Sequence, residues 1–250
     1  MNNKFLNFWQ KTFAIIKLKA KMLIGNTAAL TGPLMSVAIT VFMKFLYSDM
    51  VEGDNSPILT YVLNFGISFN LGLGAIMMSA LPLAEDKEKH TLRSLMTSSV
   101  NGLQFFIGSI FWPFLVSVVV NYIVIFVSGV NTATIDMAMF SFLTIISSLI
   151  SCMLGLLIGI IAKSQVNANN LMMPFIMVLS LVPTLSTLND TLGKISNFLY
   201  TGIITNMLNN YSEGLEFNLS FIQIAILLVC IVGISAMFVN RYKKVLVCEA

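Results

Sequence analysis

Six long segments of mostly apolar residues divide the chain, and they limit its possible folds more than any other feature of the sequence. Five of the six contain no Asp, Glu, Lys or Arg, and the first contains only Lys44. About 20 mostly apolar residues are the length that an α-helix needs to cross the hydrocarbon core of a bilayer. Hydrophobic residues make up 57% of the chain and charged residues only 10%, too few to cover a water-soluble surface. The sequence therefore predicts an all-α, polytopic membrane protein in which residues 1–250 form a single transmembrane domain.

The expected spans are residues 28–47, 58–83, 103–127, 137–162, 171–188 and 219–239. At 1.5 Å per residue the second would reach about 39 Å, which exceeds the roughly 30 Å core, so we expect it to tilt or to extend into the cytoplasm. The fifth contains Pro174 and Pro183, whose missing N–H groups are expected to bend the helix or end it early.

Residues 4–24 have the pattern of a helix that lies in the membrane interface. Phe8, Trp9 and Phe13 fall on one side of this helix, and lysines fall on the other. A signal peptide is the competing interpretation, but lysines interrupt its apolar run and no small-residue cleavage site follows. We therefore expect an N-terminal interfacial helix before the first span.

Residues 189–218 separate the last two spans. Part of this segment, ISNFLYTGIITNML, is too apolar for a solvated linker and too short to cross a bilayer. The sequence predicts a re-entrant or interfacial helical hairpin, broken near Gly202, on the external face between helices 5 and 6.

The basic residues sort by membrane side. If both termini are cytoplasmic, every Lys and Arg except Lys44 and Lys194 lies on the cytoplasmic side, as the positive-inside rule requires. Lys44, in the first span, is interpreted as a lysine that extends toward the interface. Only two of the 14 basic residues are arginine, which together with abundant Asn and Ile indicates a bacterial source of low G+C content. We expect a multi-pass protein of the bacterial cytoplasmic membrane.

Residues 84–102 form the densest run of charge in the chain, between the second and third spans. Glu85, Asp86, Lys87 and Glu88 are consecutive, and even one uncompensated charge at mid-bilayer costs roughly 3 kcal/mol or more. We therefore expect a water-facing cytoplasmic loop, in which Lys87 needs no partner beyond water. Apolar residues recur at helical spacing in its second half and predict a short amphipathic helix. The alternative is a solvated loop that carries only positive-inside charge.

This charged run resembles a known family. Its sequence from Asp86 to Val100, DKEKHTLRSLMTSSV, is similar to the cytoplasmic loop between the second and third spans of ABC-2 type transporter permeases. In that family the loop is the coupling helix, which sits in a groove of a separate ATPase subunit and transmits its motion. The resemblance implies an ATPase-coupling role for Glu85, Asp86, Glu88, Thr91, Leu92, Leu95 and Met96. It also implies six spans with both termini cytoplasmic and short external helices before the last span.

Glu88 has an expected role of its own within the resembled loop. It would lie near the N-terminus of the short amphipathic helix, where exposed backbone N–H groups favour a carboxylate. From that position it could also meet a basic residue of the ATPase.

The resemblance also implies partners. The chain has no nucleotide site of its own, because Lys163-Ser164 follows no glycine-rich turn. No cofactor is therefore expected on this chain; ATP and Mg would be bound by the partner. The expected partners are two copies of a cytoplasmic ABC ATPase, a second permease subunit that is identical or a paralogue, and membrane lipids. Nucleic acid is not expected, because the net charge of +3 is small and scattered.

Spans rich in Phe and Met but poor in ionisable groups favour a hydrophobic or amphipathic cargo, although the same residues are also typical of helix packing. Permeases that resemble this chain export bacteriocins, amphipathic peptide toxins or drugs, or give immunity by expelling them. The alternatives are an export permease for lipid-linked polysaccharide and a stand-alone membrane immunity or binding protein.

The chain is not expected to be an enzyme by itself, and a membrane-embedded hydrolase is disfavoured. His90 is the only histidine, and the spans carry no Asp or Glu that could act as an acid or base. Cys152, Cys230 and Cys248 have neither CxxC spacing nor a His nearby, so neither a metal site nor a disulfide is expected.

The fourth span carries small residues at every fourth position: Ser147, Ser151, Gly155 and Gly159. This spacing places all four on one face of the helix, where a second helix can approach closely. We expect that contact to be made inside one bundle; a contact between subunits is the alternative.

Overall fold

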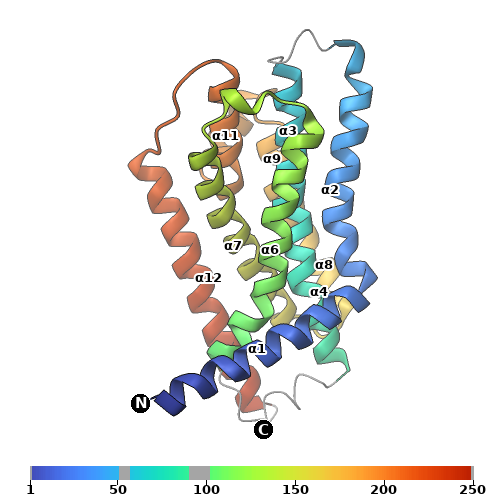
Figure 1. Ribbon diagram of the computed structural model, residues 1–250, viewed down its shortest axis with the longest axis vertical. Helices are drawn as coiled ribbons and strands as arrows, with labels where there is room; N and C mark the ends of the chain where they lie inside the picture. Colours follow the sequence, from blue (N-terminus) through green and yellow to red (C-terminus); the bar gives the residue numbers. More distant parts are fainter. Residues whose placement is uncertain (1, 51–56, 90–101, 249–250) are drawn as a thin grey trace.

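The computed structural model describes residues 2–50, 57–89 and 102–248, and the regular structure within these ranges is helical. Six helices are long and apolar enough to cross a membrane: Thr27–Leu46, Pro57–Glu88, Gly102–Ser128, Met137–Ile161, Gln165–Thr184 and Phe221–Tyr242. They run side by side as a bundle, and α1 crosses one end of it (Figure 1). We call this the α1 end, and the other the opposite end. The prediction of an all-α fold with six candidate membrane spans is confirmed for the described residues.

The second candidate span is a continuous helix in the core of the bundle. It consists of α3 (Pro57–Phe69), a π-helical turn (Asn70–Gly74) and α4 (Ala75–Glu88), and most of its side chains are buried. The predicted span ended at residue 83, whereas the helix continues to Glu88. The helix can continue because other parts of the chain supply partners for its charged last turn, as described below.

The fifth candidate span also contains a π-helical turn. It begins as α8 (Gln165–Ile176), earlier than the predicted residue 171, continues as the π-helical turn Met177–Leu181 and ends with the short α9 (Val182–Thr184). Each of the two prolines lies next to a change in the helix. Pro174 shortly precedes the π-helical turn, and Pro183 shortly precedes the helix end, which is where missing N–H groups would disturb the hydrogen-bond ladder.

The two π-helical turns pack against each other in the core. A Cβ atom on Gly72 would lie only 3.0 Å from the backbone nitrogen of Ser180, so the glycine permits close contact between the two backbones. The first π-helical turn also has a polar contact with α6 (Gly102–Ser128): the side-chain amide of Asn70 donates to Ser117 O and to Asn121 Oδ1, both at 2.8 Å.

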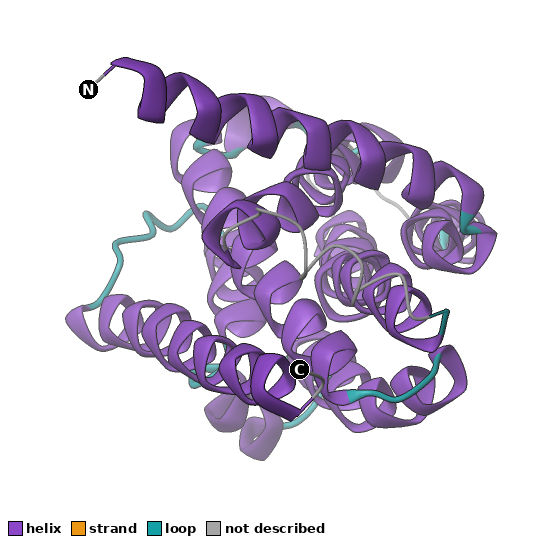
Figure 2. Ribbon diagram, turned by 90° about the horizontal axis from the view of Figure 1, so that it is seen from below, coloured by secondary structure: helices purple, strands orange, loops and turns teal. Residues whose placement is uncertain are grey.

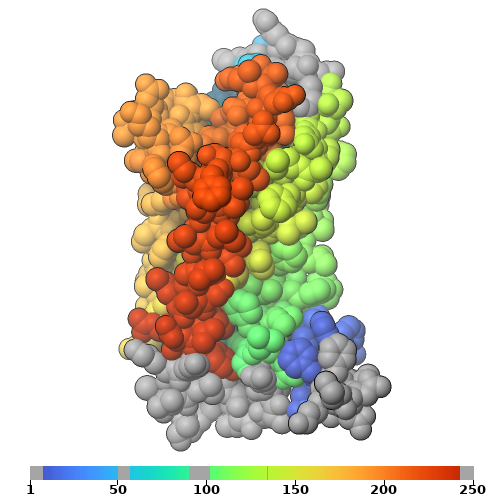
Figure 3. Space-filling view, turned by 90° about the vertical axis from the view of Figure 1, so that its left-hand side faces the viewer, coloured from blue at the N-terminus to red at the C-terminus, as the bar shows by residue number. Residues whose placement is uncertain are grey.

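The last span, α12 (Phe221–Cys248), lies on the surface of the bundle, next to α7 (Met137–Ile161). Figure 3 shows α12 in red along one face of the molecule. The C-terminal end of α12 lies at the α1 end of the bundle (Figure 1).

The N-terminal helix α1 (Asn2–Gly25) runs across the α1 end, along one side of the spans (Figures 1 and 2). Side chains of α6 hold it there, because Trp112 Nε1 donates to Ile16 O at 2.9 Å and Gln104 Nε2 donates to Phe8 O at 3.2 Å. Trp9 and Phe13 are exposed, as the pattern of an interfacial helix requires.

Two short helices separate the last two candidate spans, α10 (Asp190–Ser196) and α11 (Tyr200–Ser212). The predicted break near Gly202 is wrong, because the break falls at residues 197–199 and Gly202 lies inside α11. Its role is close packing: a Cβ atom there would lie 2.6 Å from the carbonyl carbon of Ser196. Most residues of α11 from Tyr200 to Leu208 are buried, in contact with α3 and α7.

The small residues of α7 face the interior. Ser147, Ser151, Gly155 and Gly159 are all buried. A Cβ atom on Gly155 would lie 2.5 Å from Ile76 O, and one on Gly159 would lie 2.7 Å from Ala80 O, so the backbones of α7 and α4 touch at these positions. Ser151 instead shares a hydrogen bond of 2.9 Å with the Tyr200 hydroxyl of α11. The small face therefore packs inside this chain.

We expect Gly155→Leu to lower the thermal stability of the purified protein. A leucine would meet the α4 backbone, which cannot move aside as a side chain could, and overpacking of this kind costs typically about 1–3 kcal/mol. The measurement is the melting temperature in a mild detergent. The matched control is Gly233→Leu in α12, where a Cβ atom meets nothing within 4 Å. Equal melting temperatures for the two variants would show that the α4–α7 contact is not as close as described.

Candidate functional site

The last turn of α4 carries four consecutive charged residues at the α1 end: Glu85, Asp86, Lys87 and Glu88. Successive residues of an α-helix point about 100° apart, so four in a row project on all sides of the helix. Each of the four side chains meets a different part of the chain. These residues and their partners form a polar cluster that joins α4 to its neighbours, and we call it the α4 cluster.

Asp86 and Lys19 form a buried ion pair. Asp86 is fully buried and Lys19 of α1 is only 5% exposed. The Lys19 ammonium also lies 5.1 Å from the centre of the Phe105 ring of α6, a distance at which the ring attracts a cation. Phe105 in turn stacks with Tyr242 of α12. The pair thus joins α1 to the core and borders on two further helices.

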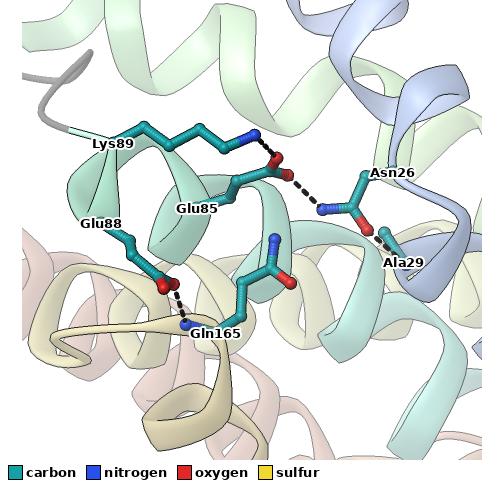
Figure 4. A network of polar contacts seen from close by, with 6 residues as sticks. All are labelled: Asn26, Ala29, Glu85, Glu88, Lys89 and Gln165. Atoms are coloured by element: carbon teal, nitrogen blue, oxygen red, sulfur yellow. Dashed lines mark hydrogen bonds and ion pairs between the residues drawn. The ribbon is translucent and has the colours of Figure 1, made fainter.

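Glu85 holds the turn between α1 and α2 (Thr27–Leu46). Its carboxylate accepts a hydrogen bond of 2.5 Å from the Asn26 side-chain amide, and the same Asn26 accepts the backbone N–H of Ala29 at the start of α2 (Figure 4). Glu85 also accepts from Lys89, which raises the pKa of that lysine. Lys89 is well exposed, so water and salt screen its attraction to Glu85. The contact with Asn26 is therefore the one that positions structure.

Glu88 contacts the N-terminal end of α8, and Lys87 contacts the C-terminal end of α7. Glu88 Oε2 accepts the backbone N–H of Gln165, the first residue of α8, at 3.0 Å (Figure 4). Lys87 Nζ donates to Ile160 O in the last turn of α7, at 2.8 Å. A helix has partial positive charge at its N-terminus and partial negative charge at its C-terminus, so both contacts have the favourable sign.

One expectation from the sequence is wrong here. Lys87 has a partner other than water, because a backbone carbonyl of α7 accepts a hydrogen bond from its ammonium group. Glu88 is the last residue of α4, and its carboxylate meets the N-terminus of α8. The short amphipathic helix that was expected to follow Glu88 falls on residues 90–101, which lie outside the described residues.

The predicted ATPase-coupling residues fall into two groups. Glu85, Asp86 and Glu88 lie in the α4 cluster and bind other parts of the same chain. Thr91, Leu92, Leu95 and Met96 lie outside the described residues. The described chain resumes at Gly102, at the start of α6, also at the α1 end.

Sequence reasoning missed the partners of the cluster, above all Lys19. A signal was nevertheless present in α1, where Thr12, Ile15, Lys19 and Leu23 recur at helical spacing and are all buried. A lysine on the stripe that faces the protein indicates a buried acidic partner, because an isolated buried charge is too costly. Asn26 and Gln165 carried no comparable signal.

The described residues include no group of three or more His, Cys, Asp or Glu side chains that could hold a metal ion. Comparison of the chain with protein-family models and with curated proteins gives no match.

Removal of one member of the buried ion pair should destabilise the protein strongly. Asp86→Leu leaves the Lys19 ammonium enclosed without its counter-charge, and such a change typically costs about 3–5 kcal/mol. The double variant Lys19→Met with Asp86→Leu replaces the pair by apolar side chains and should recover most of that loss. The measurement is thermal unfolding of the purified chain in detergent.

The matched control for this experiment is Lys17→Met, because Lys17 lies on the exposed side of the same helix. It should leave the melting temperature close to that of the wild type. If Asp86→Leu were as harmless as Lys17→Met, the pair would be solvated and would not hold α1.

Proposed function

We propose that this chain is the permease subunit of an ATP-driven exporter of the ABC-2 type, moving a hydrophobic or amphipathic substrate out of a bacterial cell. The observation that carries the proposal is the position of the α4 cluster. The cluster lies directly before the segment that resembles a coupling helix, and it binds α1, the α1–α2 turn, α7 and α8. A displacement of that segment would therefore reach the buried helix at the core of the bundle.

The energy for transport would come from a separate protein. In this proposal two copies of a cytoplasmic ATPase bind ATP and Mg, and the permease acts with a second copy or a paralogue. The chain alone would have no catalytic activity. The described residues support a mechanical role at the α1 end, because each charged side chain of the last α4 turn is attached to a different neighbouring element. The α4 cluster would transmit a movement to these elements better than a solvated loop would.

The substrate class in this proposal rests on the character of the spans. Their interior is mostly apolar, and the polar groups at its centre are neutral, such as Asn70, Ser117 and Asn121. A neutral interior of this kind favours an apolar or amphipathic cargo over an ion. The proposed group of cargoes is therefore amphipathic peptides, bacteriocins or hydrophobic drugs.

The proposal places the α1 end and both termini in the cytoplasm, and single cysteines test this. In a background with all three native cysteines changed to Ala, Glu213→Cys at the opposite end and Lys163→Cys at the α1 end are both exposed positions. We expect a membrane-impermeant maleimide to label Glu213→Cys in intact cells. Lys163→Cys should react only after the cells are permeabilised. The reverse pattern would place the α1 end outside and contradict the proposal.

The coupling role is tested by Leu95→Asp and Glu88→Ala. Burial of one leucine in a partner's groove is worth about 1.5–3 kcal/mol, so Leu95→Asp should weaken ATPase binding on the order of 10- to 100-fold. Glu88→Ala should leave the complex assembled but reduce transport per ATP hydrolysed, because the contact with the α8 N-terminus is lost. The measurements are co-purification with the ATPase encoded beside this chain, and ATP hydrolysis and export in vesicles.

Lys17→Ala is the matched control, because it removes an exposed charge at the same end of the protein. It should change neither assembly nor coupling. If Leu95→Asp assembled and transported normally, residues 90–101 would be only a connector. If the purified chain acted without any ATPase, a stand-alone immunity or binding role would replace the exporter.

A further inference from the structure

A cavity of about 500 Å³ lies at the opposite end of the bundle, far from the α4 cluster. Its walls come from α3, from the connection between α6 and α7, from the last turns of α11 and from the loop that follows α11. Figure 1 shows this connection and this loop together at the end away from α1. Cavities of roughly 300–1,000 Å³ hold drug-sized ligands, so the volume fits a small organic molecule.

The walls of the cavity combine a broad apolar surface with two carboxylates. The apolar part is formed by Leu63, Val130, Ile135, Leu208 and Leu215. Asp136 and Glu216 add the carboxylates, and the described residues that line the cavity include no Lys or Arg. An apolar surface with unbalanced negative charge is complementary to a molecule that has an apolar body and a positive charge.

Local structure holds the backbone at both carboxylate residues. Asp136 is the N-cap of α7, and its Oδ1 accepts the backbone N–H groups of Ala138 and Met139 at 2.9 and 3.2 Å. Glu216 lies in the loop after α11, whose backbone is anchored on both sides: Leu215 N–H donates to Asn210 O at 2.9 Å, and the neighbouring Phe217 is buried in the core. Both carboxylate residues are exposed, so their charges are accessible to a molecule that enters the cavity.

The negative charges of both carboxylates affect the same residue of the cavity wall, Tyr211. The pKa of the Tyr211 hydroxyl is raised, first by partial burial and then by the negative charges of Asp136 and Glu216. Asp136, Tyr211 and Glu216 all line the cavity. Lys44, which is not among the described residues that line the cavity, donates to Val127 O in the last turn of α6, at 3.0 Å.

We propose that this cavity is a binding site for a small hydrophobic cation, whose apolar body contacts Leu63, Ile135 and Leu208 and whose charge lies beside Asp136 and Glu216. Binding requires only this chain, so the proposal does not depend on the transport function proposed above. A drug-sized organic cation has both the required size and the required charge. A neutral or anionic molecule of the same shape would meet the same walls without charge complementarity.

The experiment measures binding of tetraphenylphosphonium to the purified full-length chain in nanodiscs of phosphatidylcholine, a lipid without net charge. Tetraphenylborate has nearly the same shape and the opposite charge, so it serves as the matched probe. We expect saturable binding of one tetraphenylphosphonium per chain and no saturable binding of tetraphenylborate. Absence of saturable phosphonium binding, or equal binding of the two probes, would overturn the proposal.

Variants then locate the site. Asp136→Asn with Glu216→Gln removes both charges but keeps shape, and asparagine also caps a helix well, so the fold should be preserved. This double variant should weaken phosphonium binding about tenfold or more, because two nearby opposite charges are lost. The matched control Glu213→Gln removes an exposed carboxylate of the same loop outside the cavity and should change binding less than about twofold.

A second variant tests the cavity without a change of charge. Ala133 is exposed and lies on the cavity wall, so Ala133→Trp should fill the cavity from its rim and abolish binding while both carboxylates remain. Melting temperatures close to the wild type would show that the variants are folded. Unchanged phosphonium binding in either the double variant or Ala133→Trp would place the bound cation elsewhere and overturn the proposal.

Discussion

The contact between Lys19 and Asp86 is the constraint on which the α1 end of the structure depends. Removing two charges from water costs several kcal/mol per ion, and only a close partner of opposite sign compensates for it. The pair therefore adds little net stability, but it disfavours other positions of α1, because any shift that parts the charges loses their mutual compensation. The pair fixes the position of the last α4 turn against α1. From that position Glu85, Lys87 and Glu88 contact the α1–α2 turn, α7 and α8.

Membrane helices are easy to locate in this sequence, and the reason is physical. Each span satisfies its own backbone groups, so hydropathy alone gives six segments close to the observed helices. The helix of the second span continues to Glu88, beyond the predicted end of the span at residue 83, because protein surrounds its charged last turn. The interior of the protein supplies Lys19 as a counter-charge, and a partner 67 positions away in the chain cannot be read from the charged segment itself.

Glycine shows the same difference between local and long-range information. The spacing of Gly155 and Gly159 predicts a close helix contact, but it does not say that α4 is the partner. At Gly202 the residue was interpreted as a helix breaker, whereas it permits the end of α10 to approach the first turn of α11. The cavity beside Asp136 had no signal in the sequence at all, because three separate stretches of the chain form its walls.

The π-helical turn at Asn70–Gly74 lets the buried helix hold one residue more than a regular α-helix would over the same rotation. In a regular α-helix, loss of one residue turns every following side chain by about 100° about the helix axis. Within the π-helical turn the same loss would restore α-helical geometry, and Asp86 would still face Lys19. The middle of this helix can therefore change its length without disconnecting the contact at its end.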